Sequence, residues 1–210
     1  MEPFLAEPPA GIRDLRFTVV DLETSGGVPK AFWDKHGRFQ AAAEITEVGV
    51  VTLSGPVLEN RFSRLCAIEG ALPRVIQSLT GITPRLLTDA PPWSRVAFEL
   101  APLLEGRVWV AHHAPFDGGF LKAYLPEGLW GRHRLLCTRL LVKALAPELP
   151  KRSLAECCAH FGIVNTRAHR ALQDAEATAE LLQRLMARAE EKGLDADGFL
   201  KLGEVSWRKL

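Results

Sequence analysis

Hydrophobic and polar residues follow strand-like patterns over the first third of the chain. Residues 17–20 (Phe-Thr-Val-Val) form a β-branched apolar run, which is typical of a buried strand. Residues 44–53 alternate between apolar and polar and predict a second strand. A Gly-Pro turn at 55–56 separates it from a third strand over residues 57–67. The pattern therefore predicts an antiparallel meander.

The rest of the chain shows helical spacing between short apolar runs. The runs at 107–111 and 134–137 are expected to be strands, the second at an edge of the sheet. Strands first, and then strands alternating with helices, indicate an α/β domain of three layers, in which helices cover a mixed sheet. The expected helices span residues 72–79, 92–104, 115–124, 138–146, 153–161 and 170–190.

Three segments are expected along the 210 residues. Residues 1–15 are rich in proline and unpatterned, so we expect a flexible N-terminal arm. One domain of ordinary size follows over residues 16–190. Residues 191–210 are weakly amphipathic and are left as a C-terminal tail without assigned structure. Residues 27–43 lack a clear period and are expected to form a long loop, which in a compact domain is often functional.

Composition and charge are those of an ordinary globular protein. Hydrophobic residues make up 47% and charged residues 24% of the chain. The formal net charge of +1 gives no global sign of a nucleic-acid partner. Residues 122–152, however, carry seven Lys or Arg and two Glu. This excess fits a solvated surface as well as it fits a strip that binds a phosphate backbone.

The cysteines and the hydropathy predict a cytoplasmic protein. The four cysteines form no C-x-x-C pair, and the adjacent Cys157 and Cys158 are poorly placed for a mutual disulfide. The N-terminus has an acid and prolines where a signal peptide has a basic patch and an apolar run. No apolar run approaches the roughly 18 residues of a spanning helix, so we expect no membrane association.

Two carboxylates stand at the end of the first predicted strand. Asp21 and Glu23 are two residues apart, and the side-chain period of a strand places both on one face. Paired carboxylate oxygens are ligands that suit Mg²⁺ or Mn²⁺ better than zinc. A polar strand end exposed to water is the alternative interpretation of this pair.

Two further acids and a histidine stand at helix starts. Asp117 opens a helix after an apolar strand, and Asp174 follows His169 by five residues. Each alone is explained by an ordinary helix start, but together they predict a metal-dependent hydrolase. Asp21, Glu23 and Asp174 would hold one divalent ion. Asp21 and Asp117 would help to bind a second, and His169 would deprotonate the attacking water as general base.

In these residues the chain resembles the DEDDh-type 3′–5′ exonucleases, the family of the proofreading epsilon subunit of DNA polymerase III. The first motif lies at residues 19–26 (VVDLETSG), with its usual sequel at 47–50 (EVGV). The second lies at residues 111–117 (AHHAPFD) and the third at 169–175 (HRALQDA). One motif alone would be weak evidence, but the ordered set over roughly residues 16–187 is highly specific.

The resemblance implies an RNase H-like fold with a mixed five-stranded sheet flanked by helices. It also implies two Mg²⁺ or Mn²⁺ ions per active site and hydrolysis from a 3′ end that releases nucleoside 5′-monophosphates. It assigns Asp21, Glu23, Asp117 and Asp174 to the metals and His169 to the general base.

The matching motifs further imply a set of substrate contacts. His113 stands where the family usually has asparagine, and Thr80 stands where the epsilon type often has histidine. The long loop at 27–43 carries aromatic residues among cations, so it either stacks on bases or packs its own hydrophobic side chains. The expected substrate-binding residues are Thr24, Leu79, Thr80, His113 and Phe116.

Our hypothesis is a metal-dependent 3′–5′ exonuclease that acts on the 3′ end of DNA, in repair or proofreading. The favoured partner is single-stranded DNA, and a DNA polymerase subunit is a further candidate. Three alternatives stay open: the same chemistry on RNA ends, a polymerase-associated subunit that binds without turnover, and a metal phosphatase acting on small nucleotides. The second would show the loss of a catalytic carboxylate or of the histidine, and neither is lost.

Overall fold

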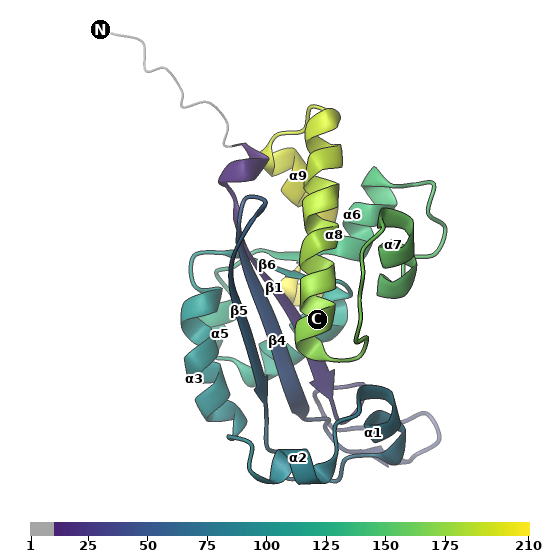
Figure 1. Cartoon of the computed structure of the whole chain (residues 1–210). Helices are drawn as coiled ribbons and strands as arrows, with labels where there is room; N and C mark the ends of the chain where they lie inside the picture. Colours follow the sequence, from purple (N-terminus) through teal and green to yellow (C-terminus); the bar gives the residue numbers. More distant parts are fainter. Residues whose placement is uncertain (1–10) are drawn as a thin grey trace, which may run out of the picture.

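The structure of the protein, a computed structural model, describes residues 11–210. Within these residues, a mixed sheet of six strands forms the middle of the molecule (Figure 1). The spatial order is β5 (Val57–Leu65), β4 (Ile45–Ser54), β1 (Arg16–Thr24), β6 (Val108–Ala111), β7 (Leu135–Cys137) and β8 (Glu204–Val205). The strands β1, β4 and β5 form an antiparallel meander. On the other side of β1, the strands β6 and β7 run parallel to it, and β8 runs antiparallel to β7.

The alternation of side chains along β1 divides the interior into two hydrophobic clusters, one on each face of the sheet. Phe17 and Val19 belong to one cluster, and Val20 and Leu22 belong to the other. All four side chains are buried. The central strand is therefore covered on both faces, which explains why its sequence is apolar over several consecutive residues.

Helices supply the outer layers on both faces. On the face of Phe17 and Val19, the long helix α8 (Ala171–Glu191) crosses the sheet (Figure 1), and α6 (Thr138–Leu145), α7 (Leu154–Phe161) and α9 (Ala196–Gly203) pack in the same cluster. The opposite face is covered by α3 (Trp93–Leu104) and α4 (Ala114–Tyr124). Three short helices, α1 (Arg74–Thr80), α2 (Pro84–Thr88) and α5 (Glu127–Trp130), and two 3₁₀ turns, η1 (Ile12–Asp14) and η2 (Trp207–Lys209), complete the fold.

The predicted α/β architecture, with a mixed sheet between helical layers, is confirmed. The expected helix at 72–79 begins two residues later, because Pro73 serves as its N-cap. Pro102, which weakens the helix at 92–104 in the sequence, lies inside α3 without ending it. Within residues 11–210, every helix is too short or too polar to span a lipid bilayer.

The sheet has one strand more than the five expected. The sixth strand, β8, comes from residues 191–210, which the sequence left as a tail, and these residues also form α9 and η2. β8 pairs with β7, so the strand expected at the edge of the sheet is covered. These residues belong to the fold because Phe199 is fully buried in the cluster beneath α8.

Two further segments differ from the sequence-based expectation. The loop at 27–43 contains a small hairpin of β2 (Phe32–Trp33) and β3 (Phe39–Gln40). At the N-terminus, the expected arm covers residues 1–15, of which residues 1–10 lie outside the described part. Ile12, at the start of η1, is buried in the main hydrophobic cluster, so the ordered fold begins before residue 16.

Candidate active site

Asp21 and Glu23 lie near the end of β1 and share one face of the sheet. Like Phe17 and Val19, they occupy odd-numbered positions of β1, so their side chains lie on the face that α8 covers. The register of the sheet places Glu47 of β4 directly opposite Glu23. Three carboxylates therefore gather where β1 and β4 pass beneath the start of α8.

Helix starts bring two more acids to this edge. Asp117 lies in the first turn of α4 and is buried, and its Oδ1 accepts a hydrogen bond of 3.1 Å from the backbone N–H of Leu22. Asp174 lies in the first turn of α8 and is also buried. Both helices begin at the edge where β1 ends, so all four predicted metal ligands converge.

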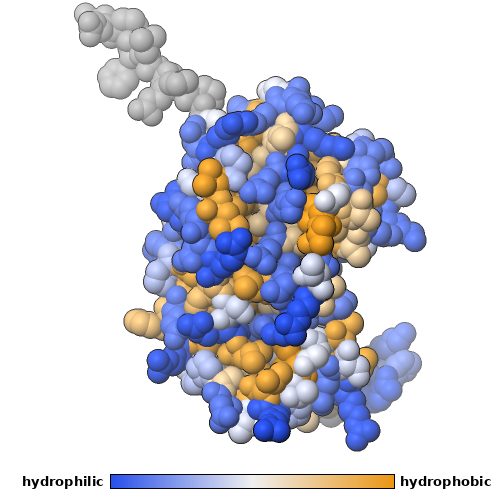
Figure 2. Space-filling view, in the orientation of Figure 1, coloured by the Kyte–Doolittle hydropathy of each residue, from blue (hydrophilic) through white to orange (hydrophobic). Residues whose placement is uncertain are grey.

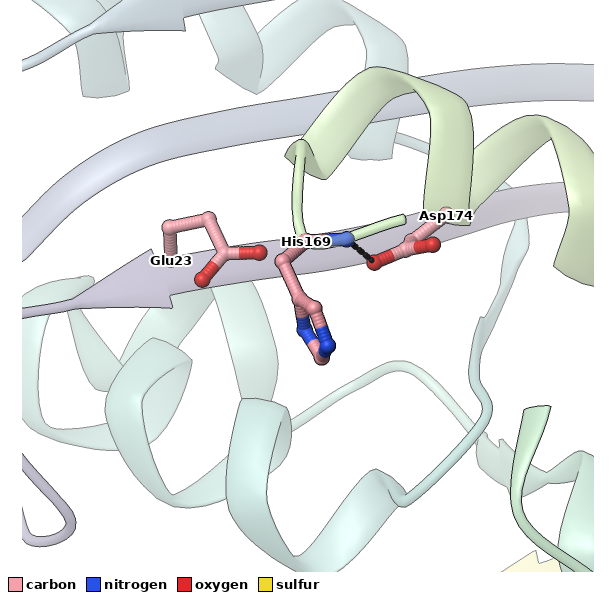
Figure 3. Close-up of side chains that lie close together, drawn as sticks. All are labelled: Glu23, His169 and Asp174. Atoms are coloured by element: carbon pink, nitrogen blue, oxygen red, sulfur yellow. Dashed lines mark hydrogen bonds between the residues drawn. The ribbon is translucent and has the colours of Figure 1, made fainter. Parts of the chain in front are cut away.

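His169 completes this group from the loop before α8. One side-chain ligand atom each from Glu23, His169 and Asp174 lies within 4.8 Å of the others (Figure 3). The imidazole is exposed, whereas Asp174 is buried behind it. The histidine is therefore open to solvent and to an incoming ligand on one side.

The backbone of His169 adopts the left-handed conformation, with φ of 63°. Non-glycine residues rarely adopt this region, although histidine is among those enriched there. The conformation is held by the backbone N–H of His169, which donates to Oδ2 of Asp174 over 2.9 Å (Figure 3). The other oxygen of Asp174 accepts from the side-chain amide of Asn165. Asp174 thus orients the loop as well as facing the acidic group.

Burial raises the pKa values of three carboxylates of the site, and repulsion between carboxylates adds to this for two of them. Burial, followed by repulsion from Asp117, Asp174, Glu23 and Glu47, raises the pKa of Asp21 well above its ordinary range. Burial and then repulsion from neighbouring carboxylates raise the pKa of Glu23 to about 8. Burial also raises the pKa of Asp117 to about 7. Such a group is held together at neutral pH by protons or by cations.

Arg170 and Glu47 form the joint between α8 and the sheet. The Arg170 guanidinium donates to both carboxylate oxygens of Glu47, over 3.0 and 2.7 Å. The backbone N–H of Ala171 donates to the same carboxylate over 3.1 Å. Glu47 is almost completely buried, so this bidentate pair fixes where the helix starts.

Gly49 allows the start of α8 to pass close over β4. A Cβ atom at this position would lie 2.1 Å from the carbonyl carbon and 2.2 Å from the oxygen of Ala171. No side chain fits between these two backbones. The Glu47-Val48-Gly49 segment therefore has a structural role. Glu47 binds the start of α8, and Gly49 leaves room for the backbone of Ala171.

Comparison with known proteins identifies the family. The family model for exonucleases of the RNase T type matches residues 18–182. The chain belongs to this family of DEDDh 3′–5′ exonucleases. The resemblance inferred from the motifs is thus confirmed, and the members of this family are metal-dependent enzymes.

Several individual members of the exonuclease family are similar to this chain. The DNA polymerase III subunit epsilon of Aquifex aeolicus is 31% identical over 176 residues, which cover 82% of this chain and 81% of that protein. A putative bifunctional exonuclease/endonuclease protein of Mycobacterium tuberculosis is 33% identical over 187 residues, which cover 87% of this chain and 28% of that protein. The solved structure of Exonuclease X in complex with 5′ overhanging duplex DNA has a TM-score of 0.66 and 22% identity, and the match covers 89% of this chain and 98% of that one.

Some of these relatives are much longer proteins. The chain spans 28% of the Mycobacterium tuberculosis protein and 12% of the PolC-type DNA polymerase III of Bacillus subtilis, to which it is 34% identical. The similarity to these proteins is thus a similarity to one part of each.

The residues present suit the divalent metals on which the exonuclease family depends. The clustered side chains offer hard carboxylate oxygens from Asp21, Glu23, Asp117 and Asp174, which suit Mg²⁺ or Mn²⁺. Burial raises the pKa values of Asp21, Glu23 and Asp117, and repulsion between carboxylates adds to the shift for Asp21 and Glu23, so a bound cation would relieve both costs. Arg170 lowers the pKa of Glu23 in part, but its guanidinium is already engaged by Glu47.

The expected substrate-binding residues differ in what their side chains can reach. Thr24 is buried, and its hydroxyl donates to the carbonyl of Gly26 over 2.6 Å. Thr80 is buried too, and its hydroxyl bonds within its own turn, donating to the carbonyl of Ile76 and accepting from the N–H of Ile82. Their side chains are therefore occupied locally, and substrate contacts for both residues stay predictions.

Leu79 is more available than its neighbour. Its side chain is 50% exposed at the end of α1. Val75 on the same helix and Leu86 on α2 are also exposed, and the part of the surface over these helices carries hydrophobic side chains among polar ones (Figure 2). Such a surface suits contact with the apolar face of a base.

His113 and Phe116 flank Asp117 at the start of α4. His113 is the N-cap of the helix and is exposed, and burial of part of its ring, followed by repulsion from Arg139, lowers its pKa. Phe116 is half-buried and packs against Phe120, with ring centroids 5.1 Å apart. Both residues lie at the start of the helix that carries Asp117, and their contacts with a substrate stay predictions.

Three residues of the site were not among those predicted from sequence. Glu47 belongs to a recognised motif, but its partner Arg170 lies 123 positions away, and only the fold brings the two together. Asn165 carries no signal, because its amide is placed against Asp174 by the loop alone. The sequence signals for the contact between α8 and the sheet are Arg170, directly after His169, and the pair Glu47 and Gly49 two residues apart in β4.

Proposed function

We propose that the protein is a metal-dependent 3′–5′ exonuclease that hydrolyses the terminal phosphodiester bond of DNA and releases nucleoside 5′-monophosphates. The observation that carries the proposal is the convergence of Asp21, Glu23, Asp117 and Asp174 with His169 at one edge of the sheet. These five residues come from β1, α4, α8 and the loop before α8. A stabilising role alone would not account for so many buried acids in mutual repulsion.

The proposed mechanism assigns a task to each residue. Asp21, Glu23 and Asp174 would hold one divalent ion, and Asp21 and Asp117 would help to hold another. Two bound ions would lower the pKa of the attacking water and stabilise the charge on the leaving oxygen. A ring nitrogen of His169 takes the proton from that water, and its exposed position lets the proton pass on to solvent.

The surroundings of the acids position the strand in this proposal. Leu79, exposed at the end of α1, contacts the terminal base, and the backbone near Thr24 contacts the terminal sugar. His113 and Phe116 contact the strand from the start of α4. The carboxylate of Asp174 binds the backbone N–H of His169, which keeps the general base in a fixed position relative to the metal-binding acids.

DNA is the proposed substrate, and repair or proofreading is the proposed role. The support comes from relatives between 31% and 34% identical that are named as DNA polymerase III subunits or PolC-type polymerases. A polymerase subunit is a candidate partner on the same ground. A cytoplasmic location stays a prediction from the cysteines, all four of which are free and buried.

The proposal is tested with matched DNA and RNA oligonucleotides that carry a label at the 3′ or the 5′ end. With Mg²⁺ or Mn²⁺, we expect a 3′-labelled DNA to lose its label at once as a nucleoside 5′-monophosphate. A 5′-labelled DNA should instead shorten stepwise, and EDTA should stop both reactions.

Other outcomes favour the alternatives. Faster digestion of the RNA oligonucleotide than of the matched DNA would indicate that RNA is the substrate. Release of inorganic phosphate from free nucleotides, with intact oligonucleotides, would indicate a phosphatase. Oligonucleotide binding without any cleavage under all metal conditions would indicate a non-catalytic subunit.

A further inference from the structure

A pocket lined by cations lies beside the start of α4, outside the group of carboxylates. Its volume is about 260 Å³, and His113, Arg139, Lys143 and Arg152 line it. No Asp or Glu is among its lining residues. Pockets for whole small molecules usually measure about 300–1,000 Å³, so this one suits a single anionic group rather than a nucleotide.

The cations of this pocket differ from the other cations between residues 122 and 152. Arg132 pairs with Glu105, Arg134 pairs with Glu204, and Lys151 lies 3.7 Å from Glu156. Lys122 donates to the carbonyls of Trp207 and Leu210. These four cations are therefore engaged within the protein.

Arg139, Lys143 and Arg152 form no ion pair with any residue of the described part of the chain. The Nε of Arg152 is also buried without a hydrogen-bond partner there. A buried donor on a charged group without a partner is costly. Three cations without an ion-pair partner around one small pocket therefore indicate that an anion binds there and neutralises their charge.

A buried histidine holds the pocket in shape. His112 Nε2 lies 2.9 Å from the backbone carbonyl of Arg152, which can only accept, so Nε2 carries the proton. Burial lowers the pKa of His112 to about 4, so the ring is neutral and its Nδ1 accepts from the Thr138 hydroxyl over 2.9 Å. The backbone N–H of Arg139 donates to the carbonyl of His112. One histidine thus ties the end of β6 to the start of α6 and to the segment before α7.

The pocket lies at the same edge of the sheet as the carboxylates. β7 runs parallel to β6 with Cys137 beside Ala111, and β6 runs parallel to β1. The segments that follow β6 and β7 therefore emerge at the edge where β1 ends. Two strand spacings of about 4.8 Å separate β7 from β1, which gives roughly 10 Å. The pocket is therefore within a few nucleotides of the carboxylates along a bound strand.

We propose that this pocket binds one backbone phosphate of the strand being digested, about two or three nucleotides upstream of the scissile bond. The inference rests on the proposed exonuclease function and adds the path of the strand, from the carboxylates across the start of α4 to α6. The pocket would give the enzyme a preference for substrates of several nucleotides over dinucleotides.

The test measures binding in EDTA, so that it does not depend on turnover. Fluorescence anisotropy is recorded for single-stranded oligonucleotides in which one phosphate at a time is replaced by an uncharged methylphosphonate. We expect the dissociation constant to rise about tenfold when the phosphate two or three positions from the 3′ end is neutralised. Neutralising a phosphate further upstream should have little effect.

Protein variants identify the groups that make the contact. In the double variant Arg139→Ala, Lys143→Ala, neutralising that phosphate should no longer raise the dissociation constant. The slope of log K against log salt should also fall by about 0.7 per lost contact. Both side chains are exposed, so we expect the double variant to fold. Lys192→Ala, an exposed lysine at the far end of α8, is the matched control and should bind as the wild type does.

Two results would overturn the inference: an equal loss of affinity at every phosphate, or an unchanged position-specific loss in the double variant. Each is distinguishable from failure of the proposed function. That failure would appear in the separate labelled-end assay as an absence of nucleotide release by the wild type.

Discussion

Asp21 lies close to all the other acids of the site. Burial, followed by repulsion from Asp117, Asp174, Glu23 and Glu47, raises its pKa, so it is near the acids expected to hold either ion. Asp21→Ala is expected to abolish nearly all turnover, because in the proposed mechanism Asp21 is the ligand that both ions would share. The variant should still fold, since one repelled carboxylate is lost from the cluster.

Nucleotide release from a labelled oligonucleotide and the melting temperature measure the two effects of Asp21→Ala. Asp89→Ala, which removes an exposed carboxylate just after α2, is the control and should keep full activity. Substantial residual activity of Asp21→Ala would refute the role of this residue as a shared ligand.

Glu23 makes the stability of the metal-free protein depend on pH. Its pKa is raised from an ordinary value of 4.5 to about 8, so between these values the folded protein keeps a proton that the unfolded chain releases. Stability must therefore fall as pH rises through this window. The expected contribution of Glu23 to this slope is about 1 kcal/mol per pH unit between pH 6 and pH 8.

Denaturant unfolding in EDTA at several pH values measures this slope. Glu23→Gln removes one of the titrating groups and should make the slope shallower, whereas Asp21 and Asp117, whose pKa values burial also raises, keep the remainder. Mn²⁺ replaces protons in the cluster, so its stabilising effect should be larger at pH 8 than at pH 6. A wild-type stability that rises with pH over this window in EDTA would contradict the assignment.

Residues that act through a local pattern could be predicted from the sequence, and residues that act through long-range contacts could not. The alternation of β1 places Asp21 and Glu23 on one face from sequence alone, and the structure agrees. Asn165 reaches Asp174 only because the loop before α8 folds back, with His169 at a positive φ. No local pattern encodes that geometry.

At the scale of elements, the contact between β4 and α8 sets the position of Asp174. Gly49→Ala would place a methyl group 2.1 Å from the backbone of Ala171, so the start of α8 must move. We expect a loss of at least about 1–3 kcal/mol in the free energy of unfolding, with a further loss of activity because Asp174 and His169 move with the helix. Gly128→Ala in α5, where an added Cβ meets nothing within 4 Å, is the control and should be neutral.

Urea unfolding and the nucleotide-release assay measure both effects of Gly49→Ala. If the variant matched Gly128→Ala in stability and activity, the close approach of α8 to β4 would not matter for the site.

The β2–β3 hairpin could not be predicted, because its strands have only two residues each and no detectable period. Its turn is held by Asp34, whose carboxylate accepts from the backbone N–H groups of His36 and Arg38. Trp33 and Phe39 pack edge to face with centroids 5.4 Å apart, yet they stay 70% and 57% exposed. The loop thus packs its own aromatic residues and also presents them to solvent.

Trp33→Ala separates the two interpretations of this hairpin. If Trp33 stacks on a base, the variant should raise KM for single-stranded oligonucleotides by a factor equivalent to about 1–3 kcal/mol, with an unchanged melting temperature. If Trp33 serves only to pack against Phe39, the melting temperature should fall and KM should stay the same. Steady-state kinetics and thermal unfolding of the same preparation decide between them.

At the scale of the whole molecule, the last twenty residues show the limit of local patterns. Residues 191–210 are short, weakly amphipathic elements, so nothing in their sequence distinguishes a tail from part of the fold. In the structure, Gly203 of α9 lies so close to α6 and β7 that an added Cβ would meet Leu141 and Leu136 within 2.9 Å. Trp207 packs against Trp109 and Trp130. Long-range packing, rather than propensity, orders this segment.

Phe199 is the residue that most directly tests this view of the C-terminal segment. It is fully buried, and its ring packs edge to face on Phe17 of the central strand β1, with centroids 6.4 Å apart. Phe199→Ala should therefore lower the free energy of unfolding by about 3–5 kcal/mol, since it leaves a cavity in the hydrophobic cluster beside Phe17. Phe98→Ala, which truncates a side chain 82% exposed on α3, should stay within about 0.5 kcal/mol of the wild type. Chemical denaturation of both variants gives the comparison, and equal stabilities would mean that residues 191–210 do not contribute to the folded core. Because Phe17 and Asp21 share a face of β1, a loss of that packing should also weaken metal-dependent nucleotide release, whereas an independent tail would leave it unchanged.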